Sequence, residues 1–244
     1  MKLKFWIVNL KKILTLLLIL IFSFSISFLI INSGSKLGKA EARFNYTVLL
    51  DAGHGGRDNG VSGASGTKEA PINLAIVRKL EKELKAIGFK VVLTRTNENG
   101  LYQENVDNYK LSDMEKRNEI INNSNADLIV SIHQNSYPNS HAVGAQVFCL
   151  EKETESENFA NAIQTELIKL LPNARKTISY GDYYLLKCSN MPSVIVECGY
   201  LTNPEEEALL QDKNYQEKVA YAITCGIIRY FGAEKVEAGG SEMV

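Results

Sequence analysis

The sequence predicts an α/β protein whose mostly parallel, doubly wound sheet forms one domain. From residue 44 onward, apolar runs that suit buried strands alternate with amphipathic segments that suit helices, and this alternation is typical of parallel sheets with helical crossovers. The chain has 244 residues, of which 45% are hydrophobic and 23% charged, which suits one globular domain or at most two. A net charge of -1 gives no electrostatic indication of nucleic-acid binding.

The N-terminal residues 1–43 are expected to lie outside the folded domain. Four lysines precede residues 13–31, a run without a single charge. As a helix this run would be roughly 28 Å long, close to the hydrocarbon thickness of a bilayer. The lysines place the N-terminus inside and the remainder across the membrane. We expect an uncleaved anchor; the alternative is a signal peptide cleaved at Ala40-Glu41-Ala42, although that motif lies about ten residues beyond the run. In both cases the protein is exported.

The domain is expected to begin with a strand, a long helix and a second strand. Residues 47–50 are a short apolar run that predicts a buried strand. Residues 70–87 predict a helix, because their apolar side chains recur on one face. A strand is expected over residues 89–94. Ser112 and Glu115 match a capping box for the next helix, which should end near residue 123.

The middle of the domain shows the same alternation. Residues 126–133 contain a continuous apolar run and predict a second fully buried strand, and residues 145–150 predict a strand with one face exposed. Thr154 and Glu157 match a capping box for a helix that should end near residue 171.

The last elements follow a weaker signal. A weak strand is expected over residues 184–187 and a strong one over residues 193–197. Asn203 and the proline after it start a short helix, and residues 215–230 predict the last one. The folded domain is therefore expected to span residues 44–232, with a flexible tail over residues 233–244.

Polar residues capable of metal chemistry fall at the expected carboxyl ends of the strands. The first strand breaks into Asp51-Ala-Gly-His-Gly-Gly-Arg-Asp58, where glycines let the backbone turn and expose His54. His133 and Glu197 each end a predicted strand, and Glu69 immediately precedes the first helix. In open α/β sheets these positions meet at one edge, where ligands bind.

Two histidines and one carboxylate are the ligand set of an open catalytic zinc site, with water in the fourth position. The sequence therefore predicts Zn2+ bound by His54, Glu69 and His133, with Glu197 placed to act as general base. Each residue also has a simpler interpretation: a hydrogen-bonded histidine, an acid at a helix N-terminus, or a buried, paired carboxylate. The third histidine, His141, lies in a polar loop and is expected at the surface.

Four cysteines show no CxxC spacing, so a zinc ribbon is not expected. An exported chain can form disulfides, but buried free thiols are an equal alternative. The cysteines are Cys149, Cys188, Cys198 and Cys225.

Five motifs occur in the order found in one known family: Asp51-Ala-Gly-His-Gly-Gly-Arg-Asp58, Glu69, Leu93-Thr-Arg-Thr96, Ala126-Asp-Leu-Ile-Val-Ser-Ile-His-Gln-Asn135 and Val194-Ile-Val-Glu-Cys-Gly-Tyr-Leu-Thr-Asn-Pro204. Through them the chain resembles, over residues 46–231, the zinc-dependent N-acetylmuramoyl-L-alanine amidases of bacterial cell walls (the Amidase_3 type). The resemblance implies a six-stranded phosphorylase/hydrolase-like sheet flanked by helices. It also implies zinc ligands at His54, Glu69 and His133 and a catalytic glutamate at Glu197. Ala52 and Gln134 replace the usual proline and alanine, but neither is a ligand.

Within this family the chain is most similar to the sporulation and germination-specific cortex amidases of spore-forming bacteria, in which one catalytic domain follows a membrane segment. This implies cleavage of the amide between N-acetylmuramic acid and L-alanine of the peptidoglycan stem peptide, in spore cortex, for muramic-δ-lactam formation. The implied location is between the membranes of the developing spore. The expected partners are peptidoglycan, the membrane through the N-terminal segment, and an accessory membrane-side protein.

In the expected mechanism zinc activates a water and polarises the amide carbonyl, and Glu197 carries the proton from that water to the departing amine. Arg95 could contact substrate, but a structural ion pair is the favoured expectation. The same two alternatives apply to Arg117. Tyr180, Tyr183 and Tyr184 are expected to form an aromatic wall for the glycan or to pack in the core.

Three alternatives share these residues. A zinc peptidase or carboxypeptidase would act on a different amide of the stem peptide. A non-catalytic cell-wall-binding protein would use the metal structurally, with four protein ligands and no open position. A partner-dependent amidase would need a membrane-side protein for full zinc occupancy and activity.

Overall fold

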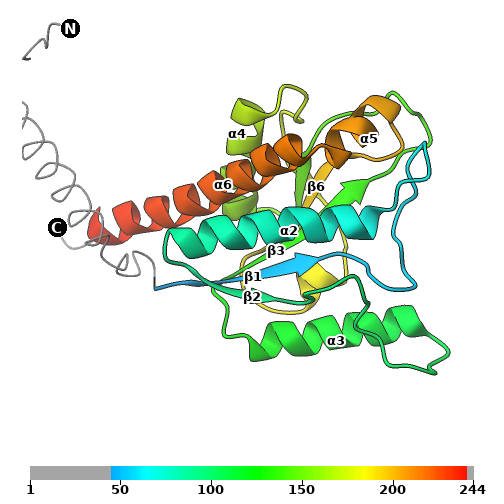
Figure 1. Cartoon of the computed structure of the whole chain (residues 1–244). Helices are drawn as coiled ribbons and strands as arrows, with labels where there is room; N and C mark the ends of the chain where they lie inside the picture. Colours follow the sequence, from blue (N-terminus) through cyan, green and yellow to red (C-terminus); the bar gives the residue numbers. More distant parts are fainter. Residues whose placement is uncertain (1–44, 241–244) are drawn as a thin grey trace, which may run out of the picture. The chain divides into compact units, whose positions relative to one another are not determined.

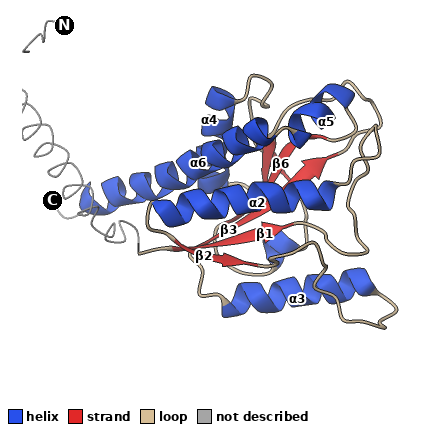
Figure 2. Cartoon of the chain, in the orientation of Figure 1, coloured by secondary structure: helices blue, strands red, loops and turns tan. Residues whose placement is uncertain are grey.

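A six-stranded sheet in the order β2-β1-β3-β6-β4-β5 forms the centre of the protein, with helices on both faces (Figure 1 and Figure 2). The structure is a computed structural model that describes residues 45–240, with side chains to residue 232. No helix in this part of the chain is long and apolar enough to span a membrane. The expected membrane segment, residues 13–31, lies outside the described residues.

The sheet is mixed, with a parallel centre. The strands are β1 (Thr47–Ala52), β2 (Lys90–Leu93), β3 (Leu128–Asn135), β4 (Gln146–Cys149), β5 (Ser179–Tyr180) and β6 (Ser193–Tyr200). Strands β2, β1, β3 and β6 run parallel, as predicted. Strand β4 is antiparallel to β6, and β5 is parallel to β4. The α/β class is confirmed, and the antiparallel β4 is the exception to the expected parallel order.

The helices divide between the two faces of the sheet. They are α2 (Glu69–Ala86), α3 (Tyr109–Asn123), α4 (Glu155–Leu170), α5 (Pro204–Gln211) and α6 (Lys213–Gly240), with a 3₁₀ helix, η1 (Leu185–Lys187). In Figure 1, α2 and α6 lie on one side of the strands and α3 lies on the other. The larger core joins α2, α4, α5 and α6 to alternate residues of the strands.

The pleat of the strands decides which residues face the smaller core. Leu49 of β1 and Ile129 of β3 pack with Ile121 of α3 and Leu185 of η1. Because side chains alternate along a strand, every second residue after these lies on the same face. His133 of β3 is one of them, so it lies on the face that α3 and η1 cover.

Two helix starts match their predicted caps. Thr154 accepts a hydrogen bond from the backbone N–H of Glu157 at 3.3 Å and so caps α4. Asn203 accepts from the N–H groups of Glu205 and Glu206 at 2.9 and 3.1 Å and caps α5. Such caps satisfy N–H groups that the first helical turn leaves unpaired.

Three local predictions were wrong. Helix α3 begins one turn earlier than expected, because Asn108 caps it by accepting from the N–H of Leu111 at 3.1 Å. Ser112 is therefore inside the helix, and its hydroxyl accepts from the N–H of Gln103 instead. The expected strand over residues 184–187 is η1, since buried Leu185 and Leu186 turn into the protein rather than alternate. The last helix, α6, continues to Gly240, beyond the expected end at residue 230.

Candidate active site

The sheet sets His133 and Glu197 side by side. They are register partners on the parallel strands β3 and β6, so their side chains leave the same face of the sheet. Both strands continue past these residues, to Asn135 and Tyr200. The prediction that each residue ends its strand was therefore wrong, because Asn135 and Tyr200 still pair beyond them, after a shift in register.

His54 follows β1, and the backbone reverses at the residue itself. Its φ is 61°, a left-handed conformation that costs about 1–3 kcal/mol for a residue other than glycine. Hydrogen bonds hold this turn: the guanidinium of Arg117 donates to the His54 carbonyl at 2.7 Å, and Gly55 N–H donates to the Asp58 carbonyl at 2.8 Å. A Cβ on neighbouring Gly53 would lie 2.2 Å from the His133 ring, so only glycine fits there.

The imidazole of His54 lies between two carboxylates. Its Nδ1 is 2.8 Å from Oδ2 of Asp58, and its Nε2 is 3.3 Å from Oε2 of Glu69. Burial lowers the pKa of His54, but Asp58 and Glu69 more than reverse this and raise it to about 9. When Nδ1–H donates to Asp58, the tautomer with Nε2 free for a metal is fixed.

Glu69, the first residue of α2, is buried at 1% exposure. Its carboxylate accepts hydrogen bonds from the N–H groups of Val61 at 2.8 Å and Gln134 at 3.0 Å, and from the amide of Asn73 at 3.1 Å. Oε1 also lies 3.0 Å from Nδ1 of His133. Burial opposes ionisation, but the neighbouring histidines hold the pKa of Glu69 far below its usual range.

His54, Glu69 and His133 thus meet at one point. One ligand atom from each residue lies within 4.8 Å of the others. The centroids of the two histidine rings are 4.9 Å apart. Two imidazole nitrogens and one carboxylate oxygen are donors that suit zinc, and three of them leave a fourth position open. The residues present therefore fit a catalytic metal site.

Glu197 lies at the same cavity without belonging to this group. Its Oε2 is buried and has no hydrogen-bond partner in the described part of the chain. Burial raises the pKa of Glu197 to about 7, although His133 opposes the shift. A buried carboxylate oxygen with no protein partner is available to a water or a substrate group.

Two buried arginines, Arg95 and Arg117, donate hydrogen bonds to the backbone next to the clustered residues. Arg117 of α3 pairs with Asp51 and, at 2.6 Å, with Asp113, which confirms the expected structural ion pair. Arg95 has different partners: it donates at 2.8–3.0 Å to the backbone carbonyls of Ala52, Gly53 and Ala70, which lie next to His54 and Glu69 in sequence, and to that of Asn97 in its own loop. It does not line the cavity, so neither the expected substrate contact nor an ion pair describes its role.

The cavity has a volume of about 290 Å³ and lies between β3, β6, α3 and η1. Tyr183 and Tyr184 line it and are 38% and 44% exposed. Tyr180 does not line it; its hydroxyl donates to Glu157. The other lining residues include His54, Asp58, Tyr109, Lys110, His133 and Glu197. Of the three tyrosines, two are therefore available to a bound glycan.

Other predicted residues lie away from this cavity. His141 is exposed, as expected. All four cysteines are free thiols.

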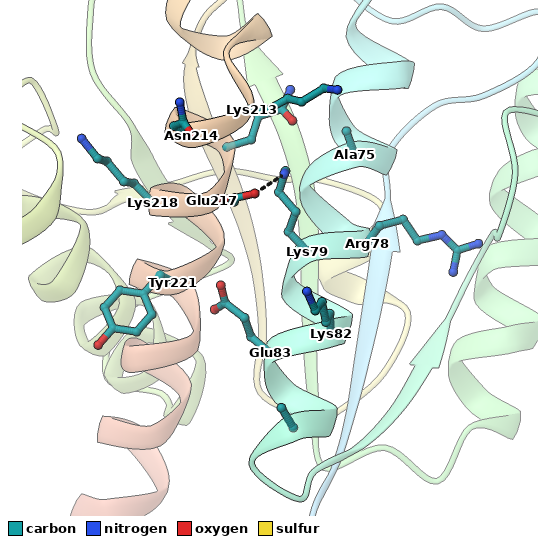
Figure 3. Close-up of a pocket in the computed structure, with 12 residues that line it drawn as sticks. Ala75, Arg78, Lys79, Lys82, Glu83, Lys213, Asn214, Glu217, Lys218 and Tyr221 are labelled. Carbon is teal, nitrogen blue, oxygen red and sulfur yellow. Dashed lines mark hydrogen bonds and ion pairs between the residues drawn. The ribbon is translucent and has the colours of Figure 1, made fainter. Parts of the chain in front are cut away.

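A larger groove of about 940 Å³ lies between α2 and α6 (Figure 3). Its lining carries lysines, Arg78, Glu83 and Glu217, and Lys79 pairs with Glu217 across it at 3.0 Å. None of the three clustered residues reaches this groove.

Comparison with known proteins identifies the family. The profile of Amidase_3, described as N-acetylmuramoyl-L-alanine amidase, matches residues 48–229. The chain belongs to this family. It is 37% identical over 188 residues to the germination-specific N-acetylmuramoyl-L-alanine amidase of Bacillus subtilis, covering 75% of this chain and 79% of that protein. The chain is therefore an N-acetylmuramoyl-L-alanine amidase, a hydrolase of cell-wall peptidoglycan.

Solved structures of amidases match the fold closely. The CwlD amidase from Clostridioides difficile, solved in complex with the GerS lipoprotein, superimposes with a TM-score of 0.75 at 40% identity and covers 78% of this chain and 100% of that chain. The catalytic domain of CwlV from Bacillus (Paenibacillus) polymyxa var. colistinus gives 0.68 at 33% identity, with 77% and 98% covered.

The residues that orient His54 and Glu69 were not predicted from the sequence. Asp58 lies four residues after His54 and contacts its Nδ1, but a carboxylate in a glycine-rich loop has no periodicity that would show its partner. Asn73 lies four residues after Glu69 on α2 and donates to it. That i, i+4 spacing on one helical face was a signal available in the sequence.

Proposed function

We propose that this amidase uses Zn2+ held by His54, Glu69 and His133 to hydrolyse the bond between N-acetylmuramic acid and L-alanine of the stem peptide. The observation that supports this most is the convergence of the three ligand atoms within 4.8 Å beside a cavity that Glu197 lines. The donor set suits zinc, and its open position suits catalysis rather than a structural role.

Each residue of the site then has a task. A zinc ion in such a group acts as a Lewis acid at the amide carbonyl and makes water easier to deprotonate. Glu197 accepts the proton of the attacking water and gives it to the amine of L-alanine as the C–N bond breaks. Asp58 keeps His54 in one tautomer, and the N–H groups of Val61 and Gln134 keep Glu69 oriented.

We also propose a role in the spore cortex, where stem-peptide removal precedes muramic-δ-lactam formation. The similarity to the germination-specific amidase of Bacillus subtilis supports this role. Peptidoglycan lies outside the cytoplasmic membrane, so the enzyme acts there, and residues 13–31 serve as its anchor. Because the CwlD amidase was solved with the GerS lipoprotein, we propose that this chain also has an accessory protein partner on the outer side of the membrane.

Digestion of purified peptidoglycan tests the proposed function. The protein is incubated with the substrate, with zinc and with a chelator, and the fragments are identified by mass spectrometry. We expect zinc-dependent release of intact stem peptides with a free L-alanine amino group. Cleavage within the stem would indicate a peptidase instead, and binding without any released peptide would indicate a non-catalytic wall protein.

A further inference from the structure

Glu207 is a buried carboxylate that the chemistry described above does not use. It lies in the first turn of α5, shortly after the strand that carries Glu197, and is 3% exposed. Its two oxygens accept from the backbone N–H of Ser65 at 2.9 and 3.1 Å, and Oε1 accepts from the Ser65 hydroxyl at 2.8 Å and from the N–H of Thr67 at 3.3 Å. All these donors belong to one loop, 142 and 140 residues away in sequence.

That loop, residues 59–68, connects the segment of His54 to Glu69. It is a closed turn, because Gly63 N–H donates to the Thr67 carbonyl at 2.7 Å and Gly66 N–H donates to the Gly63 carbonyl at 3.0 Å. A carboxylate that holds Ser65 and Thr67 therefore holds the whole turn.

The base of the same loop contacts the carboxylate of Glu69 directly. Val61 N–H donates to Oε2 of Glu69 at 2.8 Å, and Glu69 N–H donates back to the Val61 carbonyl at 3.1 Å. Oε2 is also the atom that lies 3.3 Å from Nε2 of His54. Movement of the loop would move the donor that orients this oxygen.

The loop and α5 are packed without spare room. A Cβ on Gly63 would lie 2.2 Å from Oε1 of Glu207 and 3.1 Å from the carbonyl oxygen of Leu201. Burial opposes ionisation of Glu207, but hydrogen bonds from Thr67 and Ser65 lower its pKa. Glu207 is thus an ionised acceptor for at least two backbone donors, and charge strengthens such bonds.

We propose that Glu207 is a positioning residue for the metal site: it anchors loop 59–68, and the loop in turn orients Glu69 for the metal. This inference rests on the proposed zinc site of His54, Glu69 and His133. It makes zinc affinity depend on a side chain that contacts none of the three ligands.

The test measures zinc affinity in the full chain by competition with a chromophoric chelator, and the absorption spectrum of the Co2+-substituted protein. In Glu207→Gln the amide oxygen takes the place of Oε1, but the charge is lost and the NH2 group faces the N–H of Ser65 where Oε2 accepted, so the anchor is weakened. We expect zinc affinity to fall about 10- to 100-fold, the usual effect of losing an outer-shell partner, and the Co2+ spectrum to change. Ser65→Ala removes only the hydroxyl contact, so its zinc affinity should lie between those of wild type and Glu207→Gln.

Glu206→Gln is the matched control. Glu206 is the preceding residue of α5 and is 2% exposed, but its carboxylate accepts from the N–H groups of Gly144 and Tyr200 rather than from the loop. We expect this variant to lower thermal stability while zinc affinity and the Co2+ spectrum stay as in wild type.

Wild-type affinity and spectrum in both Glu207→Gln and Ser65→Ala would overturn the inference, as would an equal loss of affinity in Glu206→Gln. If Glu207→Gln does not fold, Ser65→Ala alone decides between these outcomes. A wild-type protein that binds no zinc would instead refute the proposed metal site itself, so the two failures are distinguishable.

Discussion

Replacing Glu197 with glutamine removes the proposed general base and disturbs little else. Oε2 of Glu197 accepts no hydrogen bond in the described part of the chain, so the substitution breaks no contact at that atom. Glu197 is also outside the group of three that can hold a metal. We therefore expect Glu197→Gln to keep both its fold and its zinc.

The expected loss is in the rate. General acid–base catalysis contributes about 10²- to 10⁴-fold, which corresponds to about 3–5 kcal/mol of barrier. The upper half of that range is expected, because Glu197 is only 9% exposed and bulk water has little access to replace it. Glu197→Asp keeps a carboxylate that is one methylene shorter, so its rate should lie between those of wild type and Glu197→Gln.

The assay is the initial rate of stem-peptide release from peptidoglycan, normalised to the zinc content of each preparation. The control is Glu119→Gln, because Glu119 is an exposed carboxylate of α3 that pairs with Lys116. Its rate should match that of wild type. A rate for Glu197→Gln within about tenfold of wild type, at full zinc content, would remove Glu197 from the mechanism.

Four further predictions concern the metal, the buried charges and the cavity. His54→Ala and His133→Ala should each lose zinc on elemental analysis. Asp58→Asn should lower zinc affinity about 10- to 100-fold in a chelator titration, because Asp58 orients His54. Asp51→Asn should cost about 3 kcal/mol in urea unfolding at pH 7, because it breaks the buried pair with Arg117. Burial raises the pKa of Asp51, but the charge of Arg117 and hydrogen bonds outweigh burial and leave the pKa below its ordinary value. Wild type should therefore keep this stability above about pH 4 and lose it as the pH falls. The variant should lack this pH dependence. Tyr184→Ala should raise KM for peptidoglycan more than it lowers kcat, because the ring lines the cavity.

Each of these has a result that would contradict it. Full zinc occupancy in both histidine variants would reject the ligand set. Unchanged affinity in Asp58→Asn would show that the charge of Asp58 is not needed to orient His54. Equal acid sensitivity in wild type and Asp51→Asn would assign the pH dependence to other groups. A fall in kcat at constant KM for Tyr184→Ala would place that ring in the chemical step.

The parts of the fold that the sequence predicted are those decided by local pattern. Long apolar runs gave β1, β3 and β6, and amphipathic spacing gave α2 and α4. For α3 the capping box of Ser112 and Glu115 predicted too late a start, because Asn108 meets the first free N–H groups instead. The leucines of η1 suit a strand by composition, but they lie in a 3₁₀ helix from which Leu185 packs against Leu49 of β1 and Ile129 of β3.

The site residues also separate into those that the local sequence pattern predicts and those that it does not. The convergence of His54, Glu69, His133 and Glu197 was predictable because these residues lie near the carboxyl ends of strands or at a helix start, and these positions meet at one edge of an α/β sheet. Asp58 and Glu207 were not, because their roles depend on loops whose course no periodicity encodes. Glu207 meets its partners across 142 residues of sequence, a contact that only the folded chain reveals.

The most direct measurement of the central claim is anomalous diffraction at the zinc edge from crystals of the protein grown with zinc. We predict one strong peak about 2.0–2.2 Å from a nitrogen of His54, an oxygen of Glu69 and a nitrogen of His133, with its open side toward the cavity that Glu197 lines. A main peak elsewhere in the molecule, or one closed by a fourth protein ligand, would contradict the account.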